Sequence, residues 1–213
     1  MPVTAKICGI NDPASMRAAV KGGASHVGLV FYPPSPRSLT GPQAQRLATL
    51  VPRTVKRVGL LVDANDLQID AVLGAIPLDL LQLHGAESPG RLRAIRERFG
   101  IPLMKALRIV TAADVAIADA YVGVADALLF DAKAPPGGMP GGNAIAFDWS
   151  LLKGRDWPLP WMIAGGLDVS NLAQAVARSG ARIVDVSSGV EDAPGKKNPD
   201  KITAFLAAVA RLP

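Results

Sequence analysis

Two side chains that can move a proton stand where apolar stretches of the sequence end. Cys8 closes a run that begins at Lys6 and meets a glycine, and a thiol can serve as a general base once its surroundings stabilise the thiolate. Asp131 closes the run 128–131 and opens a long loop; a carboxyl group kept from water can act as a general acid. Taken singly, Cys8 is better explained as a buried small hydrophobe, although its place where a strand meets a glycine turn favours a catalytic role. Asp131 is equally well explained as a helix or turn cap. An acid and a base on separate strands suit an isomerase that moves a proton.

Two further polar residues follow apolar runs. Arg37 lies in the segment 33–38, which its prolines stiffen, so its guanidinium can be held ready for a carboxylate or a phosphate. A surface arginine on a loop is the alternative. His84 ends the run 80–84, and a hydrogen-bonded structural role is as good an explanation as a functional one.

Glycine turns follow the last two apolar runs of the chain. The run 161–164 stops at Gly165 and Gly166, and the run 182–186 stops before Ser188 and Gly189. Such turns let backbone N–H groups approach an oxyanion, and a helix start beyond them adds positive potential. Two adjacent turns could hold one phosphate, as after strands seven and eight of α/β barrels. Two ordinary strand-to-helix loops remain the alternative.

The elements that must position these residues alternate between strand and helix. Parallel strands joined by helices are expected from this order. The expected strands are 3–8, 26–31, 54–62, 78–83, 103–107, 127–131, 159–164 and 181–186. The expected helices are 12–21, 41–50, 65–75, 89–99, 112–120, 168–178 and 200–212. Eight strands favour closure into a single (β/α)8 TIM barrel of the α/β class, one domain over residues 1–213. The irregular link 132–149, rich in proline and glycine, is of a kind that is more often functional than idle.

Composition limits the possible chemistry and location. The chain has 213 residues, 49% of them hydrophobic, with mean hydropathy +0.26, and no apolar run reaches the roughly 18 residues of a membrane span. One cysteine excludes an internal disulfide, and two histidines leave little material for a metal site. We therefore expect no metal and no membrane association. The first ten residues lack a secretory signal pattern, so we expect a cytoplasmic protein, and a monomer because no apolar surface stripe is evident.

The net charge of +5 raises the possibility of nucleic acid binding. The densest basic group, at positions 91, 93, 96 and 98, has Glu87 and Glu97 beside it and no interleaved aromatic residues. A solvated helix face is the simpler interpretation, and we expect no nucleic acid partner. A mild positive field would help to collect an anionic small molecule.

Motifs along nearly the whole chain resemble those of the phosphoribosylanthranilate isomerase family of tryptophan biosynthesis. They are KICG (6–9), FYPPSPRSL (31–39), VGLLVD (58–63), LQLHG (81–85), LFDAK (129–133), PGGNAIAFDW (140–149), IAGGL (163–167) and VDVSSGVEDAPGKK (184–197). KICG, SPRSL and DVSSGVE are highly specific when they occur together in this order. The resemblance implies a (β/α)8 barrel without cofactor that converts N-(5-phosphoribosyl)anthranilate to 1-(2-carboxyphenylamino)-1-deoxyribulose 5-phosphate by an Amadori rearrangement.

The resemblance also implies roles for individual residues. Asp131 would protonate the ribose ring oxygen as the ring opens to a Schiff base, and Cys8 would remove the proton from sugar C2. Arg37 would bind the anthranilate carboxylate. His84 belongs to the expected substrate-binding set, and the two glycine turns would hold the phosphate. One departure is Gly141-Gly142-Asn143-Ala144, where many relatives have GGTG: alanine takes a positive φ less easily than glycine.

Other interpretations compete. One is the histidine-pathway isomerase, which performs the same rearrangement on another aminoribosyl phosphate. That family is characterised by a pair of aspartates at the barrel mouth, whereas the first strand of this chain ends in Cys8. Indole-glycerol-phosphate synthase relies on lysine, for which Lys105 is the nearest candidate. A phosphate-binding barrel without catalysis would be expected to lack Cys8 or Asp131. We expect His26 to be structural, and Asp63 and Asp185 to orient loops without a catalytic role.

Overall fold

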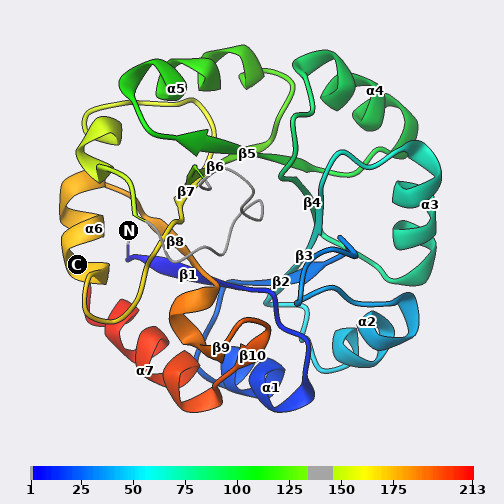
Figure 1. Cartoon of the computed structure of the whole chain (residues 1–213), viewed down its shortest axis with the longest axis horizontal. Helices are drawn as coiled ribbons and strands as arrows, with labels where there is room; N and C mark the ends of the chain where they lie inside the picture. The colour runs from blue at the N-terminus through cyan, green and yellow to red at the C-terminus, as the bar shows by residue number, and fades with distance from the viewer. Residues whose placement is uncertain (1, 134–145) are drawn as a thin grey trace.

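The computed structural model describes residues 2–133 and 146–213. Most of the link 132–149, including the departure at 141–144, lies outside the described residues. Eight parallel strands are hydrogen-bonded in chain order and β8 pairs with β1, so the sheet closes into a barrel (Figure 1). The strands are β1 (Thr4–Cys8), β2 (His26–Val30), β3 (Lys56–Leu61), β4 (Leu80–Leu83), β5 (Leu103–Ile109), β6 (Ala127–Ala132), β7 (Trp161–Ile163) and β8 (Ile183–Val186). The predicted fold and its eight strands are confirmed.

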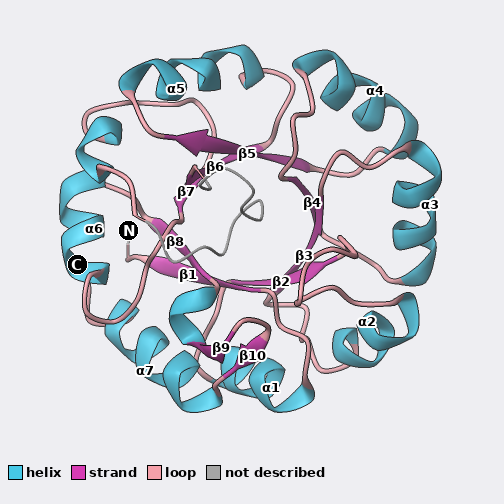
Figure 2. Cartoon of the chain, in the orientation of Figure 1, coloured by secondary structure: helices cyan, strands magenta, loops and turns pink. Residues whose placement is uncertain are grey.

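Helices form a ring outside the strands (Figure 2). They are α1 (Pro13–Lys21), α2 (Gly41–Ala48), α3 (Asp66–Ala75), α4 (Pro89–Phe99), α5 (Ala112–Ala116), α6 (Leu172–Ser179) and α7 (Pro199–Val209), with 3-10 turns η1 (Ile117–Tyr121), η2 (Trp149–Leu152) and η3 (Ser188–Val190). α4 shows why local signals predict several bounds well: the Ser88 side chain accepts the Arg91 N–H, Pro89 is the first helical residue, and Gly100 ends the helix at φ +63°. None of the helices in the described ranges is long and apolar enough to cross a membrane.

Three local predictions differ from the structure. The sixth helix begins at Leu172 and not at Asp168, because Asp168 accepts the N–H groups of Ser170 and Asn171 in a tight turn. The expected helix 112–120 is α5 continued by the 3-10 turn η1. A short antiparallel hairpin, β9 (Glu191–Ala193) and β10 (Lys196–Lys197), was not predicted.

Strand alternation separates two layers of side chains. Ala5 and Ile7 of β1 belong to the apolar layer between strands and helices, whereas Lys6 and Cys8 alternate with them and lie on the opposite face of the strand, inside the barrel. The apolar interior is a separate cluster of Val58, Leu80, Met104, Ala106, Ala127, Leu129, Met162 and Ala164. The barrel is therefore filled, and its polar interior residues gather toward the carboxyl ends of the strands.

Candidate active site

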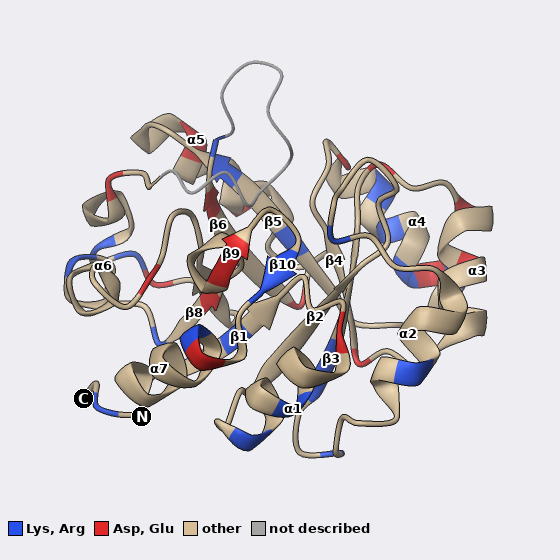
Figure 3. Ribbon diagram, turned by 60° about the horizontal axis from the view of Figure 1, so that its bottom comes forward, with Lys and Arg blue, Asp and Glu red and all other residues tan. Residues whose placement is uncertain are grey.

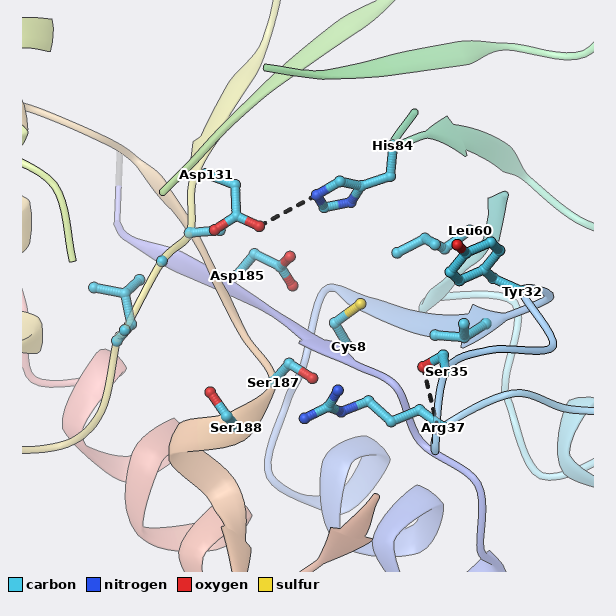
Figure 4. A pocket seen from close by; sticks show the side chains of 15 residues that line it. Cys8, Tyr32, Ser35, Arg37, Leu60, His84, Asp131, Asp185, Ser187 and Ser188 are labelled. Carbon is cyan, nitrogen blue, oxygen red and sulfur yellow. Dashed lines mark hydrogen bonds and ion pairs between the residues drawn. The ribbon is translucent and has the colours of Figure 1, made fainter. Parts of the chain in front are cut away.

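A pocket opens at the carboxyl ends of the strands and collects residues from opposite sides of the barrel (Figure 4). Its lining includes Cys8, Arg37, His84, Asp131, Gly165, Gly166 and Ser188. Gly189 follows Ser188 but is not part of the lining. Strand ends that are far apart in the sequence thus converge, which is where barrel enzymes place their chemistry. Tyr32, Asp185 and Ser187 also line the pocket, and Tyr32 was not identified from the sequence.

Asp131 and His84 face each other across the pocket. Asp131 Oδ2 lies 3.2 Å from His84 Nε2, and its Oδ1 accepts the Ala132 N–H at 2.8 Å. Gln82 Nε2 lies 2.8 Å from His84 Nδ1, and both residues are buried. The Asp131 carboxyl group is thus held by a backbone hydrogen bond at Oδ1, and its Oδ2 lies beside the imidazole. Gln82, which points into the barrel beneath His84, was not identified from the sequence.

Cys8 lies beside a buried ion pair. Lys6 Nζ contacts Asp185 Oδ1 at 2.9 Å, and both residues are buried. Burial is the largest influence on the Cys8 thiol and raises its pKa, while the Lys6 charge opposes that rise. Burial also raises the pKa of Asp185, again against Lys6. For Lys6, burial lowers the pKa, but Asp185 and Cys8 outweigh it and the net shift is upward. Lys6 therefore supplies a buried positive charge next to the thiol.

Sequence reasoning missed Lys6. Asp185, which was expected to orient a loop, lines the pocket next to Cys8 and pairs with Lys6. Strand alternation from Cys8 was the available signal: Lys6, two positions earlier, must point to the same face. Gly28 on β2 leaves room for the thiol, because a Cβ there would lie 2.8 Å from Cys8 Sγ.

Arg37 reaches the pocket with a fixed side chain. Its Nε and Nη2 donate to Glu191 Oε1 and Oε2 at 2.8 and 2.7 Å. The residue is 6% exposed, which is far from the surface arginine of the alternative interpretation. Its partner Glu191 lies on the unpredicted hairpin.

The two glycine turns adjoin each other. Gly165 and Gly166 take φ of +85° and +61°, the left-handed region that favours glycine. A Cβ on Gly189 would run into the Leu167 carbonyl, so the turn after β8 packs directly on the turn after β7. Asn171 fixes the first turn by donating to Gly166 O at 2.7 Å and accepting the Asp168 N–H.

Lys105 lies outside the pocket lining. It is 2% exposed and pairs with Glu87 at 2.6 Å, while its Nζ also donates to the Gly85 carbonyl. Burial is the largest influence on Glu87, but Lys105 outweighs it and lowers the pKa of the Glu87 carboxyl. The lysine that an indole-glycerol-phosphate synthase would need is therefore not supplied by Lys105. Asp63, at φ +47°, accepts the Ala86 N–H and so joins the loop after β3 to the loop after β4.

Taken with the closed parallel barrel, this arrangement of the mouth places the chain in the class of (β/α)8-barrel enzymes. Comparison with known proteins narrows the class. Residues 5–208 match the family described as N-(5'phosphoribosyl)anthranilate (PRA) isomerase. The N-(5'-phosphoribosyl)anthranilate isomerase of Paramagnetospirillum magneticum is 56% identical over 209 residues, 98% of this chain and 97% of the relative. That of Rhodospirillum centenum is 55% identical over an alignment of 214 positions, which covers 100% of each chain.

Solved structures agree. The phosphoribosyl anthranilate isomerase of Thermotoga maritima superposes with a TM-score of 0.87 at 36% identity, covering 97% of this chain and 98% of that one. Another such isomerase, in complex with reduced 1-(o-carboxyphenylamino)-1-deoxyribulose 5-phosphate, superposes with a TM-score of 0.82 at 33% identity, with the same coverage. The chain belongs to the N-(5'-phosphoribosyl)anthranilate isomerase family, as its motifs predicted.

Proposed function

We propose that the chain carries out the Amadori rearrangement of N-(5-phosphoribosyl)anthranilate with Cys8 as general base and Asp131 as general acid. The isomerase activity and its place in tryptophan biosynthesis follow from the family. The observation that carries the assignment of roles is the convergence of the buried Cys8 thiol, from β1, and the buried Asp131 carboxyl group, from β6, on a single pocket. Asp185 lines the same pocket but is paired with Lys6. Cys8 and Asp131 come from different sides of the barrel, so a sugar between them would present different atoms to each.

The acid step is the opening of the ribose ring. In this proposal Asp131 delivers a proton to the ring oxygen, and the bond between that oxygen and C1 breaks to give a Schiff base with the anthranilate nitrogen. The contacts of Asp131 with His84 and with the Ala132 N–H hold its carboxyl group in one orientation. A fixed orientation matters because proton transfer needs the acid within hydrogen-bond reach of the receiving atom.

The base step is proton removal from C2 by the Cys8 thiolate, which turns the Schiff base into an enolamine that tautomerises to the ketone. Burial raises the pKa of the Cys8 thiol, and Lys6 counteracts this. The thiolate is the reactive form of Cys8, and we expect the Lys6 charge beside it to favour that form. A base of high pKa gives a stronger driving force for taking the C2 proton.

Two anionic groups of the substrate suit two kinds of donor in the pocket. Arg37 suits the anthranilate carboxylate, since a guanidinium edge can bind a carboxylate through two parallel hydrogen bonds. The adjoining turns at Gly165-Gly166 and Ser188-Gly189 suit the phosphate, since turns of this kind expose backbone N–H groups; the two glycines of the first turn are left-handed. The packing of Gly189 on Leu167 supports one shared phosphate site.

The test follows the loss of anthranilate-type fluorescence when the substrate, generated in situ, meets the purified protein. We expect conversion by the wild type and none measurable above background at equal concentration for Cys8→Ala. No conversion by a folded wild type would overturn the proposed activity. The histidine-pathway aminoribosyl phosphate, assayed in parallel, tests the rival isomerase.

We also propose that the chain is one domain, acts as a monomer and resides in the cytoplasm. A related structure is described as monomers generated from the dimeric phosphoribosylanthranilate isomerase of Thermotoga maritima. The oligomeric state of this chain therefore needs its own measurement. Light scattering gives the oligomeric state, single-transition unfolding tests the one-domain organisation, and cell fractionation tests the location.

A further inference from the structure

The chain does not pass directly from β8 to the last helix. It forms the 3-10 turn η3 and then the hairpin of β9 and β10, in which Lys197 pairs with Glu191. Figure 3 shows the acidic β9 and the basic β10 side by side near the mouth. This hairpin is 154 residues from Arg37 in sequence, yet it provides the direct partner of that side chain.

The Glu191 carboxylate is fully used by four donors. Oε1 accepts from Arg37 Nε at 2.8 Å and from Lys197 Nζ at 2.7 Å. Oε2 accepts from Arg37 Nη2 at 2.7 Å and from the Gly195 N–H at 3.3 Å. Burial would raise the pKa of Glu191, but Arg37 and Lys197 outweigh it and the net shift is downward. Glu191 is therefore a buried carboxylate held between two cations.

Lys197 connects the Arg37–Glu191 pair to the turn that follows β8. Its Nζ donates to Glu191, to Ser187 O at 2.9 Å and to Ser187 Oγ at 3.1 Å, so all three ammonium hydrogens have partners. Ser187 lines the pocket and precedes the turn at Ser188. The residue that holds Arg37 is thus joined, through one lysine, to the turn proposed for the phosphate.

Close backbone contacts leave Arg37 little freedom. A Cβ on Gly9 would lie 2.5 Å from Arg37 Cδ, so the arginine stem crosses directly over the glycine that follows Cys8. A Cβ on Gly195 would lie 2.6 Å from the Pro36 carbonyl, and Asn11 Nδ2 donates to Gly195 O at 2.9 Å. The hairpin tip is therefore packed against the residue before Arg37 and tied to the loop after β1.

The outer edge of the guanidinium remains for a ligand. Nη1 donates to no protein group among the hydrogen bonds of the described residues, while Arg37 as a whole lines the pocket and points toward Ser187 and Ser188 (Figure 4). Two cations around one carboxylate leave a net positive charge at this side of the pocket. Glu191 thus takes the inner edge of the guanidinium and leaves the outer edge for an anion.

We propose that Glu191 is a positioning residue for substrate binding, which aims the outer edge of Arg37 into the pocket and couples it through Lys197 to the turn at Ser187. The inference rests on the proposed role of Arg37 in binding the anthranilate carboxylate. Glu191 does not touch the reacting atoms in this account, so its effect should appear in substrate affinity and not in turnover.

The experiment is a double-mutant cycle on KM and kcat with Glu191→Gln and Arg37→Ala. We expect Glu191→Gln to raise KM by about tenfold, because a charged, bidentate contact is lost and Arg37 is misaligned, with kcat within about twofold. In the Arg37→Ala background the same substitution should change KM by less than about twofold, since the residue through which it acts is gone.

A matched control is Asp79→Asn. Asp79 holds Arg57 through the same kind of double contact, at 3.1 and 3.4 Å, near the opposite ends of the strands. KM should be unchanged there. A fall or no change in KM for Glu191→Gln would overturn the inference. Glu191 would then only neutralise part of the positive charge of Arg37 and Lys197, without positioning Arg37 for the substrate. An equal KM increase in the presence and absence of Arg37 would overturn it as well.

A milder variant covers the case in which Glu191→Gln does not fold. Asn11→Ala removes the hydrogen bond to the hairpin tip and leaves every charge in place; KM should rise about two- to threefold, and an unchanged KM would then count against the inference. Failure of the proposed function is separately visible: it would appear as no turnover by the wild type, or as an unchanged KM in Arg37→Ala alone.

Discussion

Two ion pairs at the mouth of the barrel differ in exposure from two pairs at its base. At the mouth, the side chains of Lys6 with Asp185 and of Arg37 with Glu191 are at most 8% exposed. At the base, where the strands begin, the side chains of Arg57 with Asp79 are 22% and 37% exposed. Those of Arg96 with Asp126 are both 40% exposed. These two mouth pairs are therefore buried, whereas the two pairs at the base are partly exposed to water.

The surroundings of the pairs explain the difference. At the base, Asp79 also accepts the Arg57 N–H and Asp126 the Leu103 N–H, so each carboxylate ties a loop to the start of a strand. At the mouth, each pair lies next to a residue of the proposed chemistry. Buried pairs are costly to desolvate and give little net stability, so their presence at the mouth points to function, whereas the exposed pairs of the base act as modest structural ties.

The largest expected effect belongs to the reacting groups of the mouth. Cys8→Ala and Asp131→Asn should each lower kcat by about 10² to 10⁴, the usual contribution of a general acid or base, while the thermal midpoint stays close to that of the wild type. Steady-state kinetics and a melting curve on the same sample check this. Turnover within tenfold of the wild type in either variant would remove that residue from the mechanism.

The second effect tests whether a buried mouth pair differs from a tie at the base. Lys6→Met leaves Asp185 buried without its partner, which should cost about 3 to 5 kcal/mol of folding free energy. It should also raise the pKa of Cys8 further, so the rise of kcat/KM with pH moves to higher pH. Denaturant unfolding and a pH profile from 6 to 10 provide the two measurements.

The matched variant is the double replacement Lys6→Met with Asp185→Asn. It should recover much of the lost stability, because no unpaired charge stays buried. An unchanged pH profile in Lys6→Met, with stability alone reduced, would make this mouth pair equivalent to the pairs of the base.

The third effect concerns the end of the barrel where the strands begin, and it is a dependence of stability on pH. Burial is the main reason that the pKa of His26, at the start of β2, falls from 6.5 to about 4. The unfolded chain then binds a proton between these pH values that the folded chain does not. The contribution of His26 to the folding free energy is therefore fully present above about pH 6.5 and is lost as the pH falls toward 4. The loss is about 2 kcal/mol between pH 7 and pH 5.

Chemical denaturation at the two pH values measures this loss, and His26→Gln should make it smaller. Activity at pH 7 should be unaffected by that substitution, because His26 is not among the residues that line the pocket. A pH slope of stability that is the same in both proteins would assign the loss to other groups.

The smallest effect is expected for the exposed ties. Asp126→Asn should lower the folding free energy by about 1 kcal/mol or less, since the pair is 40% exposed on both sides and screened by water, and kcat/KM should stay within twofold. A large fall in kcat/KM with normal stability would contradict the purely structural role of this pair.

Local patterns were sufficient to predict the strands and helices of the barrel and to select the proposed base and acid, both of which line the pocket. A strand that is buried on both faces is a continuous apolar run, and such a run ends where its residue types change, which located Cys8 and Asp131. The bounds of α4 followed from Ser88, Pro89 and Gly100, whose effects act over a few residues.

The supporting residues could not be found in that way, because their partners come from elsewhere in the chain. Alternation places Lys6 inside the barrel, but its partner Asp185 is 179 residues away. The hairpin of β9 and β10 has strands of three and two residues, too short for a periodic pattern. The start of α6 depended on Asn171, whose side chain is used in the turn before the helix.

The long sequence separation of these contacts has a kinetic consequence. Lys6 with Asp185, Asn11 with Gly195 and Arg37 with Glu191 span 179, 184 and 154 residues, so none of them can form before β8 has joined β1. Closing such long loops is entropically unfavourable and slow. When the denatured chain is diluted into buffer, helix signals should therefore return first, and the recovery of catalysis should report the moment at which the ring of strands closes.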